Sequence, residues 1–292
     1  MRIVNALTID VEDYFQVSNM ESVVDRSSWK SYPLRVGDNT RKILSILEEF
    51  GVKATFFILG WVADAVPELV VEIAKQGHEL ACHGYDHQLV HKQDWHSFRA
   101  DILKARRIIE DIAGVPLLGY RAPSFSINSE GCRWALDVLA EEGFVYDSSI
   151  YFTETENQNR NPSMYEIKTN SSRNIIEFPV STLNLAGKPF IPIGGGYLRL
   201  LPVRVIKWAI SELNKRSYPA MVYLHPWELD PLQPRLPVGG LNRFRHYVNL
   251  SKTEEKLRAL LKEFDFSTAS FVIEKTMKKR LLPLKGEMEN RK

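Results

Sequence analysis

Short apolar runs alternate with longer amphipathic segments along most of this chain, and that alternation constrains the fold more than any other feature. Apolar runs rich in β-branched and aromatic residues predict buried strands, and an apolar residue every three or four positions predicts helices. The expected strands are residues 3–9, 53–60, 78–84, 117–123, 144–150, 174–182 and 219–229. The expected helices are residues 39–51, 67–77, 95–114, 130–143 and 201–216.

Strands that alternate with helices favour a parallel sheet with helices on its outside. We therefore expect an α/β protein, a distorted (β/α) barrel of parallel strands surrounded by helices. An open doubly wound sheet is the alternative, but no GxGxxG sequence follows the first strand to support it. The first helix is expected to have Asn39 or Thr40 as its cap and to stop at Gly51.

Composition narrows the functional classes. The 292 residues are 44% hydrophobic and 25% charged, with a net charge of +2, so neither nucleic acid nor another polyanion is expected as the main partner. Two cysteines outside any CxxC pair fit a reducing compartment. With no signal-peptide run and no apolar stretch of about 20 residues, we expect a cytoplasmic protein without a transmembrane segment. Basic residues gather in 275–292, where weak association with an anionic membrane surface is the alternative to simple solvation.

Polar residues recur where the expected strands end. The residues at these ends are Asp10, His83, Arg121, Asp147 and His225. The carboxyl ends of barrel strands share one face, and active sites collect on that face. The pattern therefore predicts a catalytic site there.

The sequence ACHGYDH supplies two histidines four positions apart, His83 and His87. A helical turn would aim both at one point, and a catalytic cation takes three protein ligands. Residues two apart in a strand face the same side, so Glu12 should point with Asp10 and is the preferred third ligand, with Asp13 as the alternative. Zinc is the expected cation, although these donors also suit cobalt, nickel, manganese and iron.

Three further polar residues could complete a hydrolytic site. Asp10, ionised beside a cation, could take a proton from attacking water, and Arg121 could hold it through a charge-assisted contact. His225, in LHPWELD, could protonate a departing amine near neutral pH. Each residue also has a purely structural alternative. Asp10 could be a turn residue at the strand end, Arg121 could form a structural salt bridge, and His225 could bond to the backbone in a proline turn. Aromatic side chains could line a sugar-binding groove: Phe125, Tyr151 and Trp227.

The ordered motifs TIDVED, HGYDH, YRAP, DSSIY and YLHP resemble those of the polysaccharide deacetylases of carbohydrate esterase family 4, which share homology with the rhizobial chitooligosaccharide deacetylase. The sequence GHELACHGYDH is similar to the branch found beside exosortase and exopolysaccharide genes. The resemblance covers residues 3–274. It implies one catalytic domain over 1–292, with 233–274 as a family-specific extension and 275–292 as a basic tail.

The resemblance also implies an activity: hydrolysis of N-acetyl groups on an N-acetylhexosamine polysaccharide or its precursor, in exopolysaccharide biosynthesis or modification. By position, Asp10 corresponds to the general base, Arg121 to its tether, and the histidine pair to metal ligands. His225 corresponds to the general acid, and Asp147 to a supporting acid that can pair with it. The alternatives are hydrolysis of another non-peptide C–N bond, as in a cyclic ureide such as allantoin, and an inactive carbohydrate-binding scaffold.

Two positions depart from the family pattern. The usual adjacent aspartates are replaced by the sequence DVED, which leaves the choice between Glu12 and Asp13 open. The proline of the arginine motif is followed by Ser124 instead of tyrosine. The backbone N–H of Ser124 can still donate to an oxyanion. The missing tyrosine predicts an altered acetyl pocket or substrate.

Overall fold

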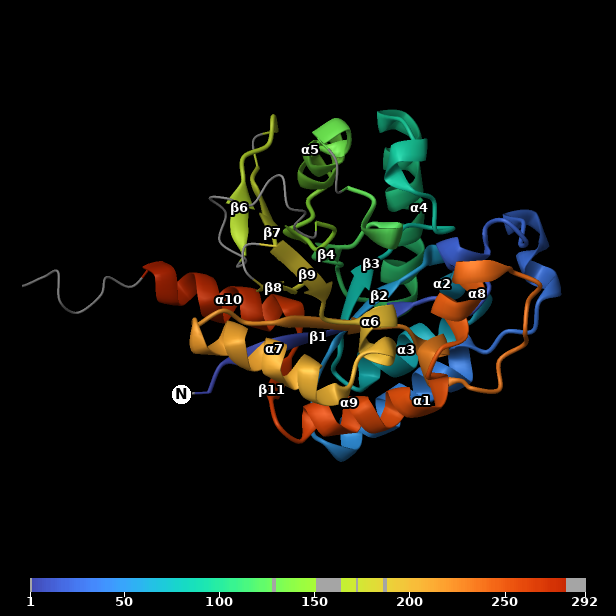
Figure 1. The fold of residues 1–292 in the computed structure, drawn as a ribbon. Helices are drawn as coiled ribbons and strands as arrows, with labels where there is room; N and C mark the ends of the chain where they lie inside the picture. The colour runs from blue at the N-terminus through green and yellow to red at the C-terminus, as the bar shows by residue number, and fades with distance from the viewer. Residues whose placement is uncertain (1, 128–129, 151–163, 172, 186–187, 282–292) are drawn as a thin grey trace, which may run out of the picture.

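One sheet of nine strands organises the residues that the computed structural model describes, which are 2–127, 130–150, 164–171, 173–185 and 188–281 (Figure 1). Its strands are β1 Val4–Val11, β2 Thr55–Ile58, β3 Glu79–Cys82, β4 Gly119–Tyr120, β5 Tyr146–Asp147, β6 Tyr165–Ile167, β7 Ile175–Glu177, β10 Met221–Leu224 and β11 Asp265–Ser267. Strands β8 Thr182–Leu185 and β9 Lys188–Pro192 form a separate antiparallel hairpin.

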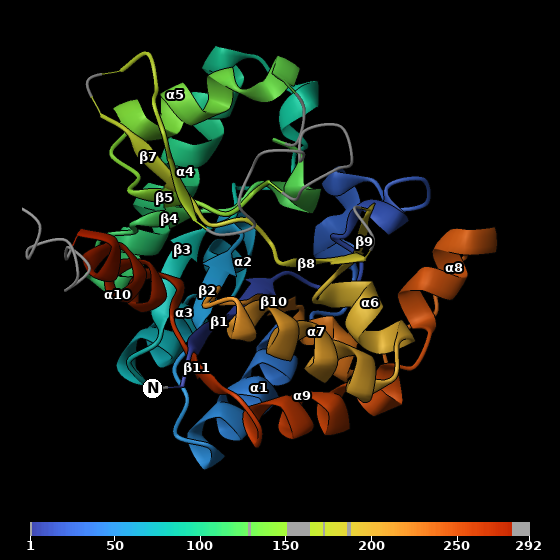
Figure 2. The same cartoon turned by 60° about the vertical axis from the view of Figure 1, so that its left-hand side comes forward.

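The strand order is β10-β1-β2-β3-β4-β5-β7-β6, and β11 pairs with the first half of β1. All these pairs are parallel except β6 with β7. The sheet curls into a half-barrel with helices around it (Figure 2). The expected α/β barrel with parallel strands and outer helices is therefore confirmed.

Helices follow most strands. They are α1 Val36–Glu49, α2 Gly60–Ala65, α3 Pro67–Lys75, α4 Trp95–Ala113, α5 Trp134–Glu141, α6 Gly195–Leu200, α7 Val203–Lys215, α8 Gly240–Tyr247, α9 Thr253–Leu261 and α10 Ala269–Leu281. Short 3₁₀ turns are η1 Ser18–Met20, η2 Arg26–Ser31, η3 Val90–Lys92, η4 Pro123–Phe125, η5 Glu130–Cys132, η6 Pro226–Leu229 and η7 Leu250–Lys252. In the described part of the chain, no helix is both long and apolar enough to cross a bilayer. The expected basic tail lies mostly outside the described residues.

The two faces of the sheet bury different groups. On β1, Leu7, Ile9 and Val11 join the main core with apolar residues of α1, α3 and α4. Ala6 faces the concave side, where a smaller core includes residues of α10. Further along this concave side, the polar Asp10 follows Ala6 at the carboxyl end of the strand. The same face thus changes from apolar to polar along the strand. The polar candidate site therefore lies at the carboxyl end of β1.

Helix α1 begins at Val36, earlier than expected, so Asn39 and Thr40 lie inside it and the expected cap is wrong. The carboxylate of Asp13, distant in sequence, accepts the backbone N–H groups of Arg35 at 2.7 Å and Val36 at 2.9 Å. A tertiary contact satisfies the orphan donors at this helix start, where the sequence pattern predicts a local cap.

Candidate metal and catalytic site

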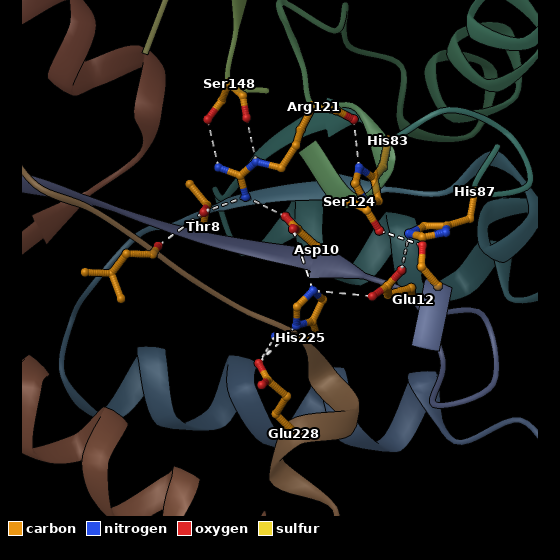
Figure 3. Close-up of polar contacts among 12 residues, drawn as sticks. Thr8, Asp10, Glu12, His83, His87, Arg121, Ser124, Ser148, His225 and Glu228 are labelled. Atoms are coloured by element: carbon orange, nitrogen blue, oxygen red, sulfur yellow. Dashed lines mark hydrogen bonds and ion pairs between the residues drawn. The ribbon is translucent and has the colours of Figure 1, made fainter. Parts of the chain in front are cut away.

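Polar side chains from different strands meet at the carboxyl edge of the sheet (Figure 3). Asp10 belongs to β1, His83 directly follows β3, Arg121 directly follows β4 and His225 directly follows β10. Figure 3 shows Asp10, His83 and His225 pointing toward a common space. The parallel register explains this convergence, because every one of these strands ends at the same edge.

Three buried residues form a cluster suited to a cation. Ligand atoms of Glu12, His83 and His87 all lie within 4.8 Å of one another. Glu12 Oε2 lies 3.0 Å from His87 Nε2, yet among the described residues no donor is aligned to give it a hydrogen bond. A buried carboxylate oxygen without a donor is costly. Two imidazole nitrogens and a carboxylate oxygen match the donor set of a divalent-metal site, so these residues fit such an ion.

The hydrogen bonding of His83 prepares one nitrogen for a cation. Its Nδ1 lies 2.8 Å from the carbonyl oxygen of Arg121. Since a carbonyl only accepts, Nδ1 carries the proton and the Nε2 lone pair is free for a metal. Burial lowers the pKa of His83 to about 4, against the opposing effect of Asp10, and keeps the ring neutral at pH 7.

A loop, and not the expected helical turn, presents the two histidines. His83 ends the extended segment, and the chain then turns through Gly84 with φ 73° and His87 with φ 58°. Left-handed backbone is uncommon for a histidine. The HxxxH spacing therefore works through a sharp turn after a strand.

The structure brings Glu12, and not Asp13, to the histidines. Asp13 accepts backbone N–H groups from Tyr14 at 2.8 Å, from Arg35 at 2.7 Å and from Val36 at 2.9 Å. Burial raises the pKa of Asp13 to about 6, although these bonds oppose the rise. Its carboxylate serves the start of α1 and lies outside the metal cluster.

Arg121 holds Asp10 in a fixed orientation. Its Nη1 lies 2.6 Å from Asp10 Oδ1 and 2.9 Å from Thr8 Oγ1. Its other nitrogens donate to Ser148, Nη2 to Oγ at 2.9 Å and Nε to the carbonyl oxygen at 3.1 Å. The guanidinium is 0% exposed and lies 4.1 Å from the centre of the Phe57 ring. The expected tether geometry is thus present.

His225 has one nitrogen facing the cluster and one facing away from it. Its Nε2 lies 3.3 Å from Glu12 Oε1 and 3.8 Å from Asp10 Oδ2. Its Nδ1 lies 3.0 Å from Glu228 Oε2. Burial alone would lower the pKa of His225, but the charges of Glu228, Glu12 and Asp10 outweigh burial and raise the pKa to about 9.

The sequence analysis did not identify Glu228 and Arg199, which hold His225 in position. Glu228 is fully buried, and its Oε1 accepts a hydrogen bond from Arg199 Nε at 2.6 Å. Burial would raise the pKa of Glu228, but Arg199 and His225 lower it to about 2. The available signal was the HPWE sequence, in which a glutamate three residues after a histidine can return to it through a tight turn.

The expected pairing of Asp147 with His225 is wrong. Asp147 Oδ1 accepts a hydrogen bond from Ser149 Oγ at 2.6 Å, and its carboxyl group also interacts with buried Glu177. The cause is the alternation of a strand: Ser148 turns to the interior and bonds Arg121, so Asp147 turns to the other face. Burial raises the pKa of Asp147, although Glu177 and Ser149 bond to it.

Beside this site lies a cavity of about 680 Å³, lined by two of the three expected groove residues, Phe125 and Trp227, and by Ser124. Ser124 and Phe125 line it from a strained turn with φ of 50° and 56°. Trp227 is 3% exposed and stacks between His225 and His246, with ring centres 5.3 and 4.2 Å apart. Tyr151 lies outside the described residues.

Two family models match this chain. One, described as polysaccharide deacetylase, matches residues 28–142, and the other, a domain of unknown function (DUF3473), matches residues 148–274. The first model contains His83, His87 and Arg121, and the second contains His225. Together they cover most of the chain, but Asp10 and Glu12 lie before both matched regions.

Curated relatives match over short segments. A peptidoglycan-N-acetylglucosamine deacetylase of Bacillus cereus is 36% identical over 98 residues, which are 34% of this chain and 36% of the relative. A bifunctional xylanase/deacetylase of Pseudobutyrivibrio xylanivorans is 36% identical over 91 residues, 31% of this chain and 15% of the relative. The alignments thus span about a third or less of these two relatives.

Solved structures match over nearly the whole chain. A Mycobacterium smegmatis protein described as a polysaccharide deacetylase has a TM-score of 0.65 at 21% identity, covering 95% of this chain and 91% of that one. The Puue allantoinase has a TM-score of 0.58 at 17% identity, covering 93% and 89%. At such identities the likeness concerns the fold alone.

Proposed function

We propose that this chain, in which residues 28–142 match the polysaccharide deacetylase family, is a metal-dependent hydrolase that removes N-acetyl groups from an N-acetylhexosamine glycan. The observation that carries the proposal is the convergence of Glu12, His83 and His87 with Asp10 and His225 beside one cavity. Amide hydrolysis needs a polarised carbonyl, a base for water and an acid for the leaving nitrogen.

Glu12, His83 and His87 would hold the cation, for which we propose zinc because imidazole and carboxylate donors suit it, with cobalt, nickel, manganese or iron as competitors. When bound, such an ion supplies Lewis-acid polarisation of the acetyl carbonyl. The remaining tasks fall to this chain's own side chains.

Asp10 would accept the proton of the attacking water. Arg121 bonds its Oδ1 and leaves Oδ2 directed toward His225, so one carboxylate oxygen stays available. His225 would donate its Nε2 proton to the leaving nitrogen, since Glu228 holds Nδ1 and sets which nitrogen faces the site. The backbone N–H of Ser124 would stabilise the oxyanion. Asp147 would act only indirectly, through Ser149.

We propose further that the glycan is an exopolysaccharide or its precursor, handled in the cytoplasm. The support is the second matched region, together with the resemblance to the exopolysaccharide-associated branch. In this proposal residues 233–274 form a family-specific extension of a single catalytic domain, and 275–292 a basic tail with weak affinity for anionic membranes.

The test is acetate release from a chitooligosaccharide by the full chain, before and after chelation and zinc return. We expect chelation and His83→Gln each to lower the rate about 100-fold or more, since metal polarisation supplies several kcal/mol of barrier reduction. The matched control is His91→Gln, an exposed histidine of the same region, which should leave the rate unchanged. Full activity after complete chelation would reject the metal mechanism.

The same assay separates the alternatives. Hydrolysis of allantoin without release of acetate from any glycan would favour the ureide reaction. Binding of glycans with no hydrolysis of either substrate would favour an inactive scaffold.

A further inference from the structure

The cavity continues from the catalytic side chains to a wall made by α6 and α8, which lie next to each other in Figure 2. Four residues of α8 and its C-terminal end line it: Leu241, Phe244, Arg245 and Val248. Their spacing of three, four and seven positions puts them on one helical face. Tyr197 and Leu200 of α6 contribute the facing side.

This wall is apolar and open. Leu241 is 59% exposed, Phe244 53%, Leu200 46% and Tyr197 43%. Helix α8 buries only His246 and directs its large apolar side chains at the cavity, whereas most helices here direct them at the core. A contiguous exposed apolar surface beside a catalytic centre marks a binding groove. From here on, the α6–α8 wall means the four exposed apolar side chains of Tyr197, Leu200, Leu241 and Phe244.

A positively charged side chain, Arg245, lies on the same face of α8. Arg245 is exposed and lines the cavity, and among the described residues no carboxylate forms an ion pair with it. The groove therefore presents a free positive charge next to apolar surface.

We propose that the α6–α8 wall holds a hydrocarbon chain, joined through an anionic phosphate-containing linkage to the N-acetylhexosamine, so that the substrate is a lipid-linked sugar. The inference rests on the proposed function and names its substrate class. Leu200 and Leu241 offer no flat ring for a sugar to stack on, whereas the rings of Phe244 and Tyr197 can pack against a hydrocarbon chain as well as a sugar. Sugar hydroxyls need polar partners, and the Tyr197 hydroxyl is the one such group among these four side chains. Aliphatic chains need only apolar surface, and Arg245 complements the charge of the linkage.

The experiment measures binding by calorimetry to the full chain, so it does not depend on turnover. The probes are the methyl and octyl β-glycosides of N-acetylglucosamine, the octyl phosphodiester of the same sugar, and chitotriose, with octyl compounds below their micelle concentrations. Each buried methylene strengthens binding about fourfold, so we expect the octyl glycoside to bind at least about tenfold more tightly than the methyl glycoside. The phosphodiester should bind more tightly again, with salt-dependent affinity.

Variants locate the effect. Leu241→Ser combined with Phe244→Ser should remove the octyl advantage and leave methyl glycoside affinity unchanged. Arg245→Gln should remove only the added affinity of the phosphodiester. Leu232→Ser is the matched control, because Leu232 is 82% exposed and lies outside the groove.

Equal affinity for methyl and octyl glycosides would overturn the inference. So would affinity that grows with the number of sugars and falls in the double variant, since the wall would then be a glycan subsite. If octyl binding behaves as expected but acetate is released from no probe, the deacetylase proposal fails while the apolar chain site stands.

Discussion

At the scale of single residues, Arg121 shows how this site depends on buried charge. It is the largest side chain that the described structure buries completely, and its guanidinium bonds Asp10 and Thr8 of β1 and Ser148 after β5. A buried ion pair of this kind adds little net stability over an apolar pair, but losing one partner leaves an uncompensated charge. The contact therefore orients Asp10, but a mutation of either Arg121 or Asp10 should destabilise the fold.

We expect Arg121→Met to lower the free energy of unfolding by about 3 to 5 kcal/mol, because Asp10 then stays buried without its partner. Urea denaturation measures the change. The control is Arg258→Met, which removes solvent-screened surface pairs with Glu254 and Glu49 and should change the free energy of unfolding far less. Equal costs for both variants would mean that Asp10 does not depend on Arg121.

At the scale of elements, His78 connects the starts of two neighbouring strands. Its Nδ1 accepts the backbone N–H of Ala54 at 3.2 Å, just before β2, and its own residue directly precedes β3. Burial, with a smaller effect of Lys53, lowers the pKa of His78 to about 4. The bond needs a neutral ring, because a protonated Nδ1 cannot accept.

This depressed pKa predicts a pH dependence of stability. Between pH 6.5 and 4 the unfolded chain binds a proton at His78 and the folded chain does not. The contribution of neutral His78 to the free energy of unfolding is therefore complete above pH 6.5 and is lost as the pH falls toward 4. The loss should be on the order of 3 kcal/mol. Urea denaturation at several pH values, compared between wild type and His78→Gln, isolates it. His96→Gln, at an exposed histidine, should keep the wild-type slope, and an unchanged slope in His78→Gln would refute the assignment.

At the scale of the whole molecule, the metal cluster joins segments that the chain separates. Glu12 follows β1, and the two histidines follow β3, with β2 between these strands in the sheet. An ion bound by all three would link them only in the folded state. Binding to the folded state alone stabilises it by mass action.

We therefore expect free zinc at 100 times its dissociation constant to raise the free energy of unfolding by about 2.7 kcal/mol, and chelation to reverse the gain. Thermal unfolding with and without zinc measures the shift. His87→Gln should lose most of it, while His91→Gln should keep it. A zinc-dependent shift that survives in His87→Gln would place the ion elsewhere.

Local patterns were sufficient for the parts of this protein that depend on neighbours in sequence. Apolar runs predicted β1, β2, β3, β4 and β10, and their common direction predicted that the polar residues at the strand ends would meet. Asp10, His83, Arg121 and His225 do so (Figure 3), but Asp147, predicted with them, turns to the other face. These predictions follow from periodicity and from the geometry of a parallel sheet alone. They needed no knowledge of which distant segments touch.

Contacts between distant segments were decided only by the tertiary structure. Whether Glu12 or Asp13 reaches the histidines depends on the start of α1, which takes the Asp13 carboxylate. The partner of His225 depends on which face of β5 carries Asp147, and the apolar wall depends on α6 lying beside α8. Periodicity records which residues share a face of one element, but it carries no information on what that face will meet.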